Sequence, residues 1–139
     1  MKVIVAGSRE FTDYQVVCRV LHAHRQQITQ IITGGARGAD RLGYRWSWKH
    51  QVPHKLFRAE WERWGKSAGM RRNAQMAQAG DVLVAFWSLT SRGTAHMIGE
   101  MQRLGKPVVV FGLDGREVEG APWHQALTRT ISEAQSTHT

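Results

Sequence analysis

The apolar residues of this chain gather into five short runs, separated by longer stretches of mixed polarity. The runs cover residues 3–6, 28–33, 53–57, 82–86 and 108–111. Three of them, at 3–5, 82–85 and 108–110, are almost continuously apolar. A continuous run is typical of a strand that is covered on both faces, as in a parallel sheet flanked by helices. The pattern therefore predicts five strands in a mainly parallel sheet.

The stretches between the runs have helical spacing of their apolar residues. They predict helices over about residues 12–26, 36–50, 67–78 and 94–104. Thr12 and Gln15 have the spacing of a capping box at the start of the first helix. Strands and helices then alternate, so right-handed crossovers produce an α/β fold: a Rossmann-like, doubly wound, five-stranded sheet with helices on both faces.

The pattern weakens after residue 111. Residues 112–115 indicate a turn, Pro122 and Trp123 suit the start of a short helix, and 135–139 form a polar tail. There is no internal repeat and no linker, and 139 residues suit one buried core better than two. We therefore predict a single domain over residues 1–134.

The charge balance is the unusual part of the composition. The chain has 19 Lys and Arg against 11 Asp and Glu, a net charge of +8, and arginine outnumbers lysine 14 to 5. Such a balance favours nucleic acid, a membrane surface or phosphorylated small molecules as partners. Arginine also favours bidentate contacts to phosphate or carboxylate. Charge alone does not choose among these partners.

Several classes of protein are disfavoured by what the chain lacks. Cys18 is the only cysteine, which excludes an internal disulfide, and it lies in an apolar run where we expect it to pack. No stretch approaches about 18 apolar residues, and the apolar start is too short for a signal peptide. We therefore expect a cytoplasmic protein with no membrane partner. No paired-His spacing occurs, and we expect no metal and no cofactor.

Three junctions between a predicted strand and the next helix carry residues suited to phosphate binding. They are residues 7–9 (Gly-Ser-Arg), 34–40 (Gly-Gly-Ala-Arg-Gly-Ala-Asp) and 87–94. In a doubly wound sheet such junctions share the carboxyl edge, where ligands bind at helix N-termini. Tight turns explain the glycines of any one loop, but each of these loops, with Thr33 at the start of the second, has both a hydroxyl and an arginine. A G-x-G-x-x-G after the first strand and a G-x-x-x-x-G-K-[ST] are both absent, which disfavours a standard dehydrogenase and a P-loop ATPase.

The segments at 3–9, 34–40 and 70–73, together with Met76 and Gly93-Thr94, resemble the SLOG superfamily, and within it the YspA/cpYpsA-related branch. The resemblance covers about residues 2–111, and 34–40 is its most specific part. It implies a Rossmann-like sheet that binds a nucleotide-type phosphorylated small molecule through these loops. Members are often linked to nucleotide signalling and to phage or prophage genes. Relatives commonly dimerise, so we expect a homo-oligomer.

The ligand-binding residues that we predict are Gly7, Ser8, Arg9, Gly34, Gly35, Ala36, Arg37, Gly38, Asp40, Arg72, Asn73, Ser91, Arg92, Gly93 and Thr94.

A more distant resemblance connects the chain with the Lonely guy (lysine-decarboxylase-like) phosphoribohydrolases, which cleave the N-glycosidic bond of nucleoside monophosphates. Arg72 matches the arginine of that family's Arg-Lys pair, and Gly93-Thr94 match its Gly-Thr. Asn73 stands where the lysine is expected, no Pro-Gly-Gly precedes Gly93, and Met97 stands at the position of the glutamate. Glu100, nearly one turn on, is the best remaining carboxylate. For an enzyme, Arg72 and Glu100 are therefore the candidate catalytic residues.

Structural interpretations compete with these roles. Asp40 suits a ribose hydroxyl and the free N–H groups of a helix start equally well. Glu100 shares a helix face with His96, but a salt bridge with Arg103 or Arg72 explains it at least as well. His96 suits a polar contact at the pocket wall better than acid–base chemistry.

Basic residues outside the loops suggest another kind of partner. Residues 37, 41, 45 and 49 form a basic row along the second helix, and basic residues continue to 72 with Trp61 and Trp64 among them. Such interleaving suits a stacking platform for single-stranded nucleic acid, and the DNA-processing protein DprA belongs to the same superfamily. Against this, Glu60 and Glu62 interrupt the row, and we expect Trp46 and Trp48 to pack. Segment 58–66 has no clear periodicity, so we expect a loop over the pocket in which a tryptophan stacks on a base or excludes water.

Three functional hypotheses follow from these observations. The first is a module that binds a nucleotide or a nucleotide-derived molecule, such as an ADP-ribose or NAD-related species, as a sensor or a sequestering protein. The second is an N-glycosidic nucleotide hydrolase. The third is a protein that binds single-stranded nucleic acid.

Overall fold

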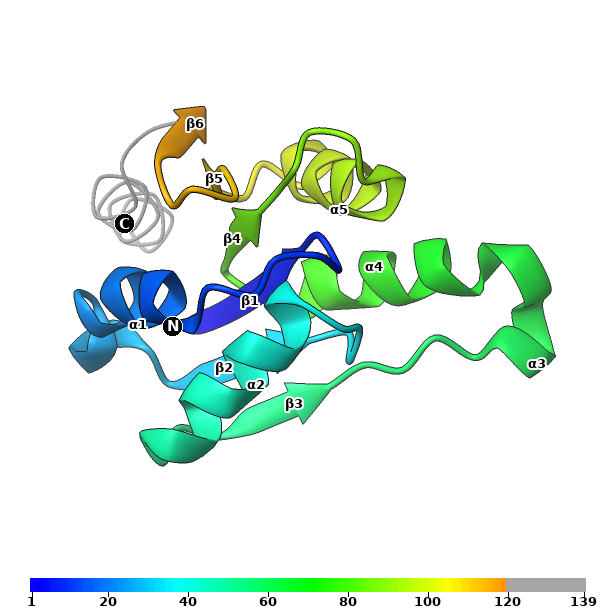
Figure 1. Cartoon of the computed structure of the whole chain (residues 1–139). Coiled ribbons are helices and arrows are strands. Elements are labelled where there is room, and N and C mark those ends of the chain that lie inside the picture. Colours follow the sequence, from blue (N-terminus) through cyan, green and yellow to red (C-terminus); the bar gives the residue numbers. More distant parts are fainter. Residues whose placement is uncertain (120–139) are drawn as a thin grey trace, which may run out of the picture.

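The structure is a computed structural model and describes residues 1–119 (Figure 1). Its sheet has six strands in the order β3-β2-β1-β4-β5-β6. They are β1 (Lys2–Gly7), β2 (Gln30–Thr33), β3 (His54–Leu56), β4 (Val82–Phe86), β5 (Val108–Phe111) and β6 (Glu117–Glu119). The first five are parallel to one another, as the apolar runs predict. The fold is therefore a Rossmann-like α/β fold with a mainly parallel sheet.

The connections reverse direction beside β1. From β1 the chain adds β2 and β3 on one side, then crosses to β4 and β5 on the other. The register aligns Val3 with Ile31 of β2 and with Val82 of β4. The loops after β1 and β4 therefore diverge at the carboxyl edge, and this switch point is where doubly wound sheets bind ligands.

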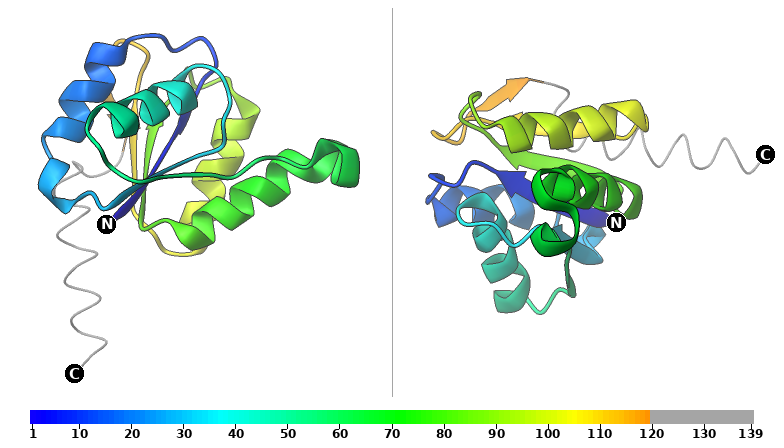
Figure 2. Two further views of the ribbon diagram at one scale, coloured as in Figure 1. Left: turned by 90° about the horizontal axis from the view of Figure 1, so that it is seen from below. Right: turned by 90° about the vertical axis from the view of Figure 1, so that its right-hand side faces the viewer.

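The helices are α1 (Tyr14–His22), α2 (Ala39–Lys49), α3 (Trp61–Trp64), α4 (Ala68–Ala79) and α5 (Arg92–Arg103), with 3-10 turns at Arg25–Gln27 and Gly65–Ser67. Helices α1 and α2 cover one face of the sheet, and α4 and α5 cover the other (Figure 2). The α3 segment extends away from the sheet at the start of α4 (Figures 1 and 2).

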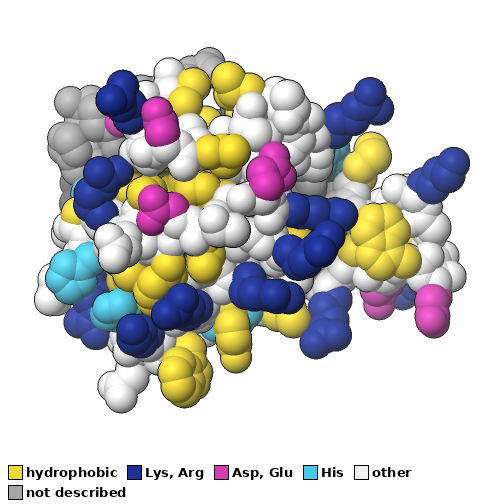
Figure 3. Space-filling view, in the orientation of Figure 1, with side chains coloured by type: hydrophobic (Ala, Val, Ile, Leu, Met, Phe, Trp, Pro, Cys, Tyr) yellow, Lys and Arg dark blue, Asp and Glu magenta, His cyan; other side chains and the backbone are white. Residues whose placement is uncertain are grey.

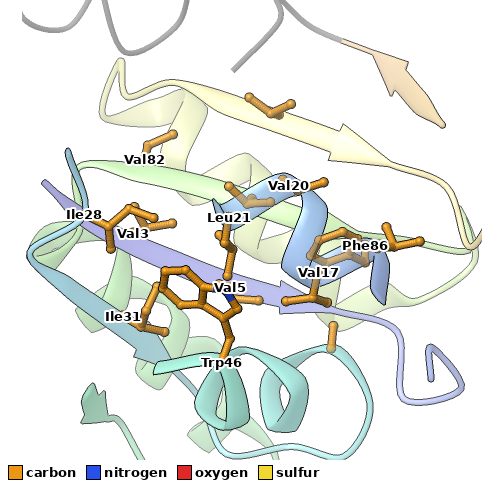
Figure 4. Packing of buried hydrophobic residues seen from close by; sticks show 14 of the residues in the cluster. Val3, Val5, Val17, Val20, Leu21, Ile28, Ile31, Trp46, Val82 and Phe86 are labelled. Carbon is orange, nitrogen blue, oxygen red and sulfur yellow. The ribbon is translucent and has the colours of Figure 1, made fainter. Parts of the chain in front are cut away.

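Alternate residues of the strands feed two hydrophobic clusters, one on each face. Val3 and Val5 pack beneath α1 and α2, where Trp46 is completely buried (Figure 4). Ile4 belongs to the other cluster, together with Met76 of α4 and Met97 and Met101 of α5. Strands that supply apolar side chains to both faces explain why their sequences are continuously apolar.

Some expectations about the elements need correction. The sheet has six strands rather than five, because β6 pairs antiparallel with β5 after a turn that Gly112 N–H closes onto Arg116 O at 2.8 Å. Segment 58–66 contains the short helix α3 instead of being only a loop. Asp13 rather than Thr12 caps α1, since its Oδ1 accepts from Val16 N at 3.3 Å.

Among the tryptophans, Trp48 does not pack as expected, because 75% of it is exposed. The helix predicted from Pro122 and Trp123, the polar tail and the domain limit at 134 lie outside the described residues.

Candidate functional site

A cavity of about 350 Å³ lies at the switch point, between the loops that follow β1, β2 and β4 and the facing sides of α4 and α5. The predicted binding residues that line it are Gly7, Arg9, Ala36, Asp40, Arg72, Asn73, Ser91, Gly93 and Thr94. The three glycine-bearing loops thus meet at one place, although they are far apart in the sequence.

The loop after β1 turns sharply at Gly7. Its φ is +155°, and a Cβ there would collide with the Phe86 carbonyl of β4. Ser8 follows, donates its N–H to Phe86 O at 2.8 Å, and is completely buried. Its Oγ accepts the N–H of Ser88 at 2.9 Å. Ser8 therefore joins the loops after β1 and β4 from beneath and does not line the cavity, whereas Arg9 is exposed at its edge.

Asp40 holds the glycine loop after β2 in place. Its Oδ2 accepts the N–H groups of Gly34 at 3.0 Å and of Ala36 at 3.4 Å. The side chain is almost completely buried, and this desolvation raises its pKa to about 6. The Ala36 N–H, the charge of Arg72 and the Gly34 N–H oppose the rise. Asp40 therefore binds backbone N–H groups, but those of the preceding loop instead of those at the start of α2, where no side chain caps the helix.

Arg72 stands at the centre of the site and is fixed by two hydrogen bonds. Its Nη1 donates to Gly34 O at 2.8 Å and its Nε donates to Asn73 Oδ1 at 3.0 Å. A Cβ on Gly34 would collide with this guanidinium, so the close approach requires glycine. Burial lowers the pKa of Arg72, the Asp40 carboxylate raises it, and Arg9 lowers it. No described residue accepts a hydrogen bond from its Nη2.

Asn73 connects α4 to α5. Its Nδ2 lies 3.2 Å from Gly93 O, to which it donates, and 3.1 Å from His96 Nδ1. Its Oδ1 already accepts from Arg72. Asn73 is buried and lines the cavity, but these contacts make it chiefly a positioning residue for Arg72 and for the start of α5.

The start of α5 closes the cavity on the β4 side. Ser91 caps the helix, and its Oγ accepts the N–H of Thr94 at 3.4 Å. The first N–H groups of a helix have no intrahelical partner, and they carry partial positive charge. A Cβ on Gly93 would meet nothing within 4 Å, so the backbone there is open to the cavity. This arrangement can bind an anion.

Several predicted residues lie elsewhere. Arg37 and Arg92 are exposed and do not line the cavity, and Gly38 has φ +78° in the turn before α2. Gly34 and Gly35 line an adjoining cavity. Glu100 lies outside the cavity and accepts from Arg103 Nη2 at 2.9 Å, with His96 Nε2 at 3.5 Å. The two proposed catalytic residues are therefore not brought together at the cavity.

Five lining residues are absent from the predicted binding residues: Ala6, Glu10, Met76, Thr90 and Met97. Ala6 and Glu10 directly flank the loop at 7–9, and Thr90 lies within the junction at 87–94, a signal that could have included them. Met76 and Met97 are buried in helices, and nothing in their spacing separates them from other core residues. Met97 occupies the position where the phosphoribohydrolases would place a glutamate.

The adjoining cavity measures about 380 Å³ and shares Arg9, Ala36 and Arg72 with the first. Trp61 of α3 forms part of its wall. Figure 3 shows Lys and Arg side chains gathered between the body of the molecule and the projecting α3 segment.

In the described part of the chain, no helix is long and apolar enough to cross a membrane, and no three His, Cys, Asp or Glu side chains cluster as metal ligands would.

Comparison with known proteins agrees with this geometry. Residues 1–64 match the YAcAr family, described as the YspA, cpYpsA-related SLOG family. The chain is also 41% identical over 120 residues to the Gene 61 protein of Mycobacterium phage D29, an alignment that covers 80% of this chain and 96% of that protein. The chain belongs to the YspA, cpYpsA-related SLOG family. No solved structure gives a significant match.

Membership of the SLOG family confirms the resemblance carried by residues 3–9 and 34–40, which both fall within the matched region. It indicates a nucleotide-related ligand-binding role for the protein. The phage relative agrees with the expected link to phage genes.

Proposed function

We propose that the cavity at the switch point binds a nucleotide or a nucleotide-derived small molecule, so that the protein acts as a sensor of that molecule or sequesters it. ADP-ribose and NAD-related species are the finer candidates. The observation that supports this most is the convergence of Arg9, Arg72 and the open start of α5 on one cavity. Membership of the SLOG family agrees with it.

The site has separate means of holding phosphate and sugar. Phosphate oxygens would accept hydrogen bonds from the first amides of α5 at Gly93 and from Nη2 of Arg72, to which no residue of 1–119 offers an acceptor. Arg9, exposed at the edge, would add a second positive charge. Glu10 and Thr90 line the cavity and have the carboxylate and hydroxyl groups that bind sugar hydroxyls.

The test is a thermal-shift panel of nucleoside mono- and diphosphates, cyclic nucleotides, NAD and ADP-ribose, followed by calorimetric titration. We expect at least one ligand to stabilise the protein, since a ligand that binds only the folded state raises its melting temperature. If none does so at millimolar concentration, the proposal is wrong.

Arg72→Gln should weaken binding of the best ligand about tenfold or more, because a hydrogen bond to a charged group is lost. Arg71→Gln is the matched control: Arg71 is the adjacent residue of α4, is exposed, and lies outside both cavities. Melting temperatures of both variants separate lost binding from lost folding. Equal weakening in both variants would contradict a specific role for Arg72.

Neither other hypothesis gains support from the geometry. A hydrolase needs a carboxylate near the scissile bond, but Met97 occupies the position expected for it and Glu100 is paired with Arg103 outside the cavity. The carboxylates that line the cavity are those of Glu10, which is exposed, and Asp40, which accepts the N–H groups of Gly34 and Ala36. For nucleic acid, the ring of Trp64 is not open for stacking on a base, because the guanidinium groups of Arg71 and Arg63 lie over it at 3.8 and 4.8 Å from its centroid. Release of free base from AMP or NAD is the assay for the hydrolase. Binding of oligonucleotides that weakens with rising salt is the assay for nucleic-acid binding.

A further inference from the structure

The adjoining cavity has an aromatic side chain in its wall, which the cavity at the switch point lacks. Its walls include Leu56, Ala59 and Trp61, and its floor includes the backbone of Gly34 and Gly35. Gly35 has φ +78°, and a Cβ there would lie 2.8 Å from Leu56 Cδ1. The two glycines have no side chain to fill the cavity, and its aromatic wall, with Leu56 and Ala59 in the same lining, suits a planar ring.

Trp61 is held at this wall rather than left loose on the surface. A Cβ on Gly69, the second residue of α4, would lie 3.4 Å from Cη2 of the Trp61 ring, so the indole lies directly against that backbone. Even so, 58% of Trp61 is exposed. Trp64, three residues on, lines neither cavity and lies beneath the guanidinium group of Arg71. Of the two, only Trp61 offers a ring to a molecule in the cavity.

Arg72 and Arg9 stand between the two cavities and line both. Arg58 adds a further positive charge beside Trp61. The cavities measure about 350 and 380 Å³, and each is at the lower end of the range for small-molecule sites, about 300 Å³ upward. A single nucleoside monophosphate would occupy only one of them.

From this arrangement we infer that the two cavities form one bipartite site, for a ligand in which a base–ribose unit and a second sugar-containing unit are joined by a pyrophosphate. The inference rests on the proposed function and deepens it. The base stacks on Trp61, the pyrophosphate lies between Arg9 and Arg72 and reaches the first amides of α5, and the second unit occupies the rest of the cavity at the switch point. The ligand class is therefore dinucleotide-like rather than mononucleotide.

Calorimetric titration of Trp61→Ala, Trp61→Phe and Trp64→Ala with three probes tests the inference: ADP-ribose, ADP and inorganic pyrophosphate. In the wild type, ADP-ribose should bind more tightly than ADP. Trp61→Ala should weaken ADP-ribose and ADP about tenfold or more, the usual effect of losing base stacking on an aromatic ring, and leave pyrophosphate unchanged. Trp61→Phe should keep most of the affinity, and Trp64→Ala should match the wild type.

Two results would overturn the inference while leaving the proposed function intact. One is equal loss of pyrophosphate and ADP binding in Trp61→Ala, which would mean that Trp61 only shapes the phosphate site. The other is equal affinity of the wild type for ADP and ADP-ribose, which would mean that the second cavity is not used. If the wild type binds none of the nucleotides of the panel, the proposed function and this inference both fail.

Discussion

At the scale of single residues, the cavity depends on the buried carboxyl group of Asp40. This side chain connects the backbone of Gly34 and Ala36 and lies next to Arg72. Its pKa is raised from 3.8 to about 6 because burial disfavours the charged form. Between these two values the folded chain binds more protons than the unfolded chain at this group, so this contribution to stability is present at low pH and is lost as the pH rises through about 6.

Asp40→Asn should remove this dependence. The amide oxygen can still accept the N–H groups, but it does not titrate. The free energy of unfolding of the variant, relative to that of the wild type, should therefore be about 2–3 kcal/mol higher at pH 7 than at pH 4. Urea unfolding at several pH values measures it. Asp114→Asn, at an exposed carboxyl group, controls for the loss of a charge. A constant difference between Asp40→Asn and wild type across this range would show that Asp40 does not titrate there.

At the scale of elements, Lys106 secures the end of α4. Its Nζ donates to the carbonyls of Ala77 at 2.7 Å, Gln78 at 3.0 Å and Gly80 at 2.8 Å. Carbonyls at a helix C-terminus lack intrahelical donors, and a cation there also suits the helix dipole. Burial lowers the pKa of Lys106, while Asp81 raises it. This contact holds the end of α4, the helix that carries Arg72, against the segment that leads into β5.

Lys106→Met keeps the aliphatic stem and removes the three hydrogen bonds. We expect the free energy of unfolding to fall by about 1–3 kcal/mol, the cost of leaving helix carbonyls without donors. Chemical denaturation measures it against Lys66→Met, which changes an exposed lysine in the turn before α4. A change as small as that of the control would mean that water satisfies these carbonyls equally well.

The long elements could be predicted from the sequence because the spacing of their apolar residues matches the positions that are buried. The run at 82–86 is fully buried, and it coincides with β4. The short elements could not: α3 has four residues, none of them buried, and β6 has three, with Val118 46% exposed. Their positions depend on contacts with neighbouring segments, such as the pairing of β6 with β5, rather than on a periodic pattern of their own.

At the scale of the whole molecule, parallel topology brings the loops together. Sequence reasoning could place residues 7–9, 34–40 and 91–94 at one edge because parallel strands end there. The salt bridge of Glu100 with Arg103, one of the interpretations open from the sequence, is present. The sequence could not tell that Met97 faces the cavity, because a methionine in a helix suits the core equally well. It also could not show that Ser8 and Asp40 support the loops from within.

The most direct test of the central claim, that a ligand binds at the start of α5, is the affinity of Gly93→Leu for the best nucleotide of the panel. Gly99→Leu is the matched control, because a Cβ at either glycine would meet nothing within 4 Å, but only Gly93 lines the cavity. Both variants should fold as well as the wild type, since each replaces glycine in α5 with a better helix former. We expect calorimetric titration to show binding lost in Gly93→Leu and kept in Gly99→Leu. Full affinity in Gly93→Leu would contradict the claim.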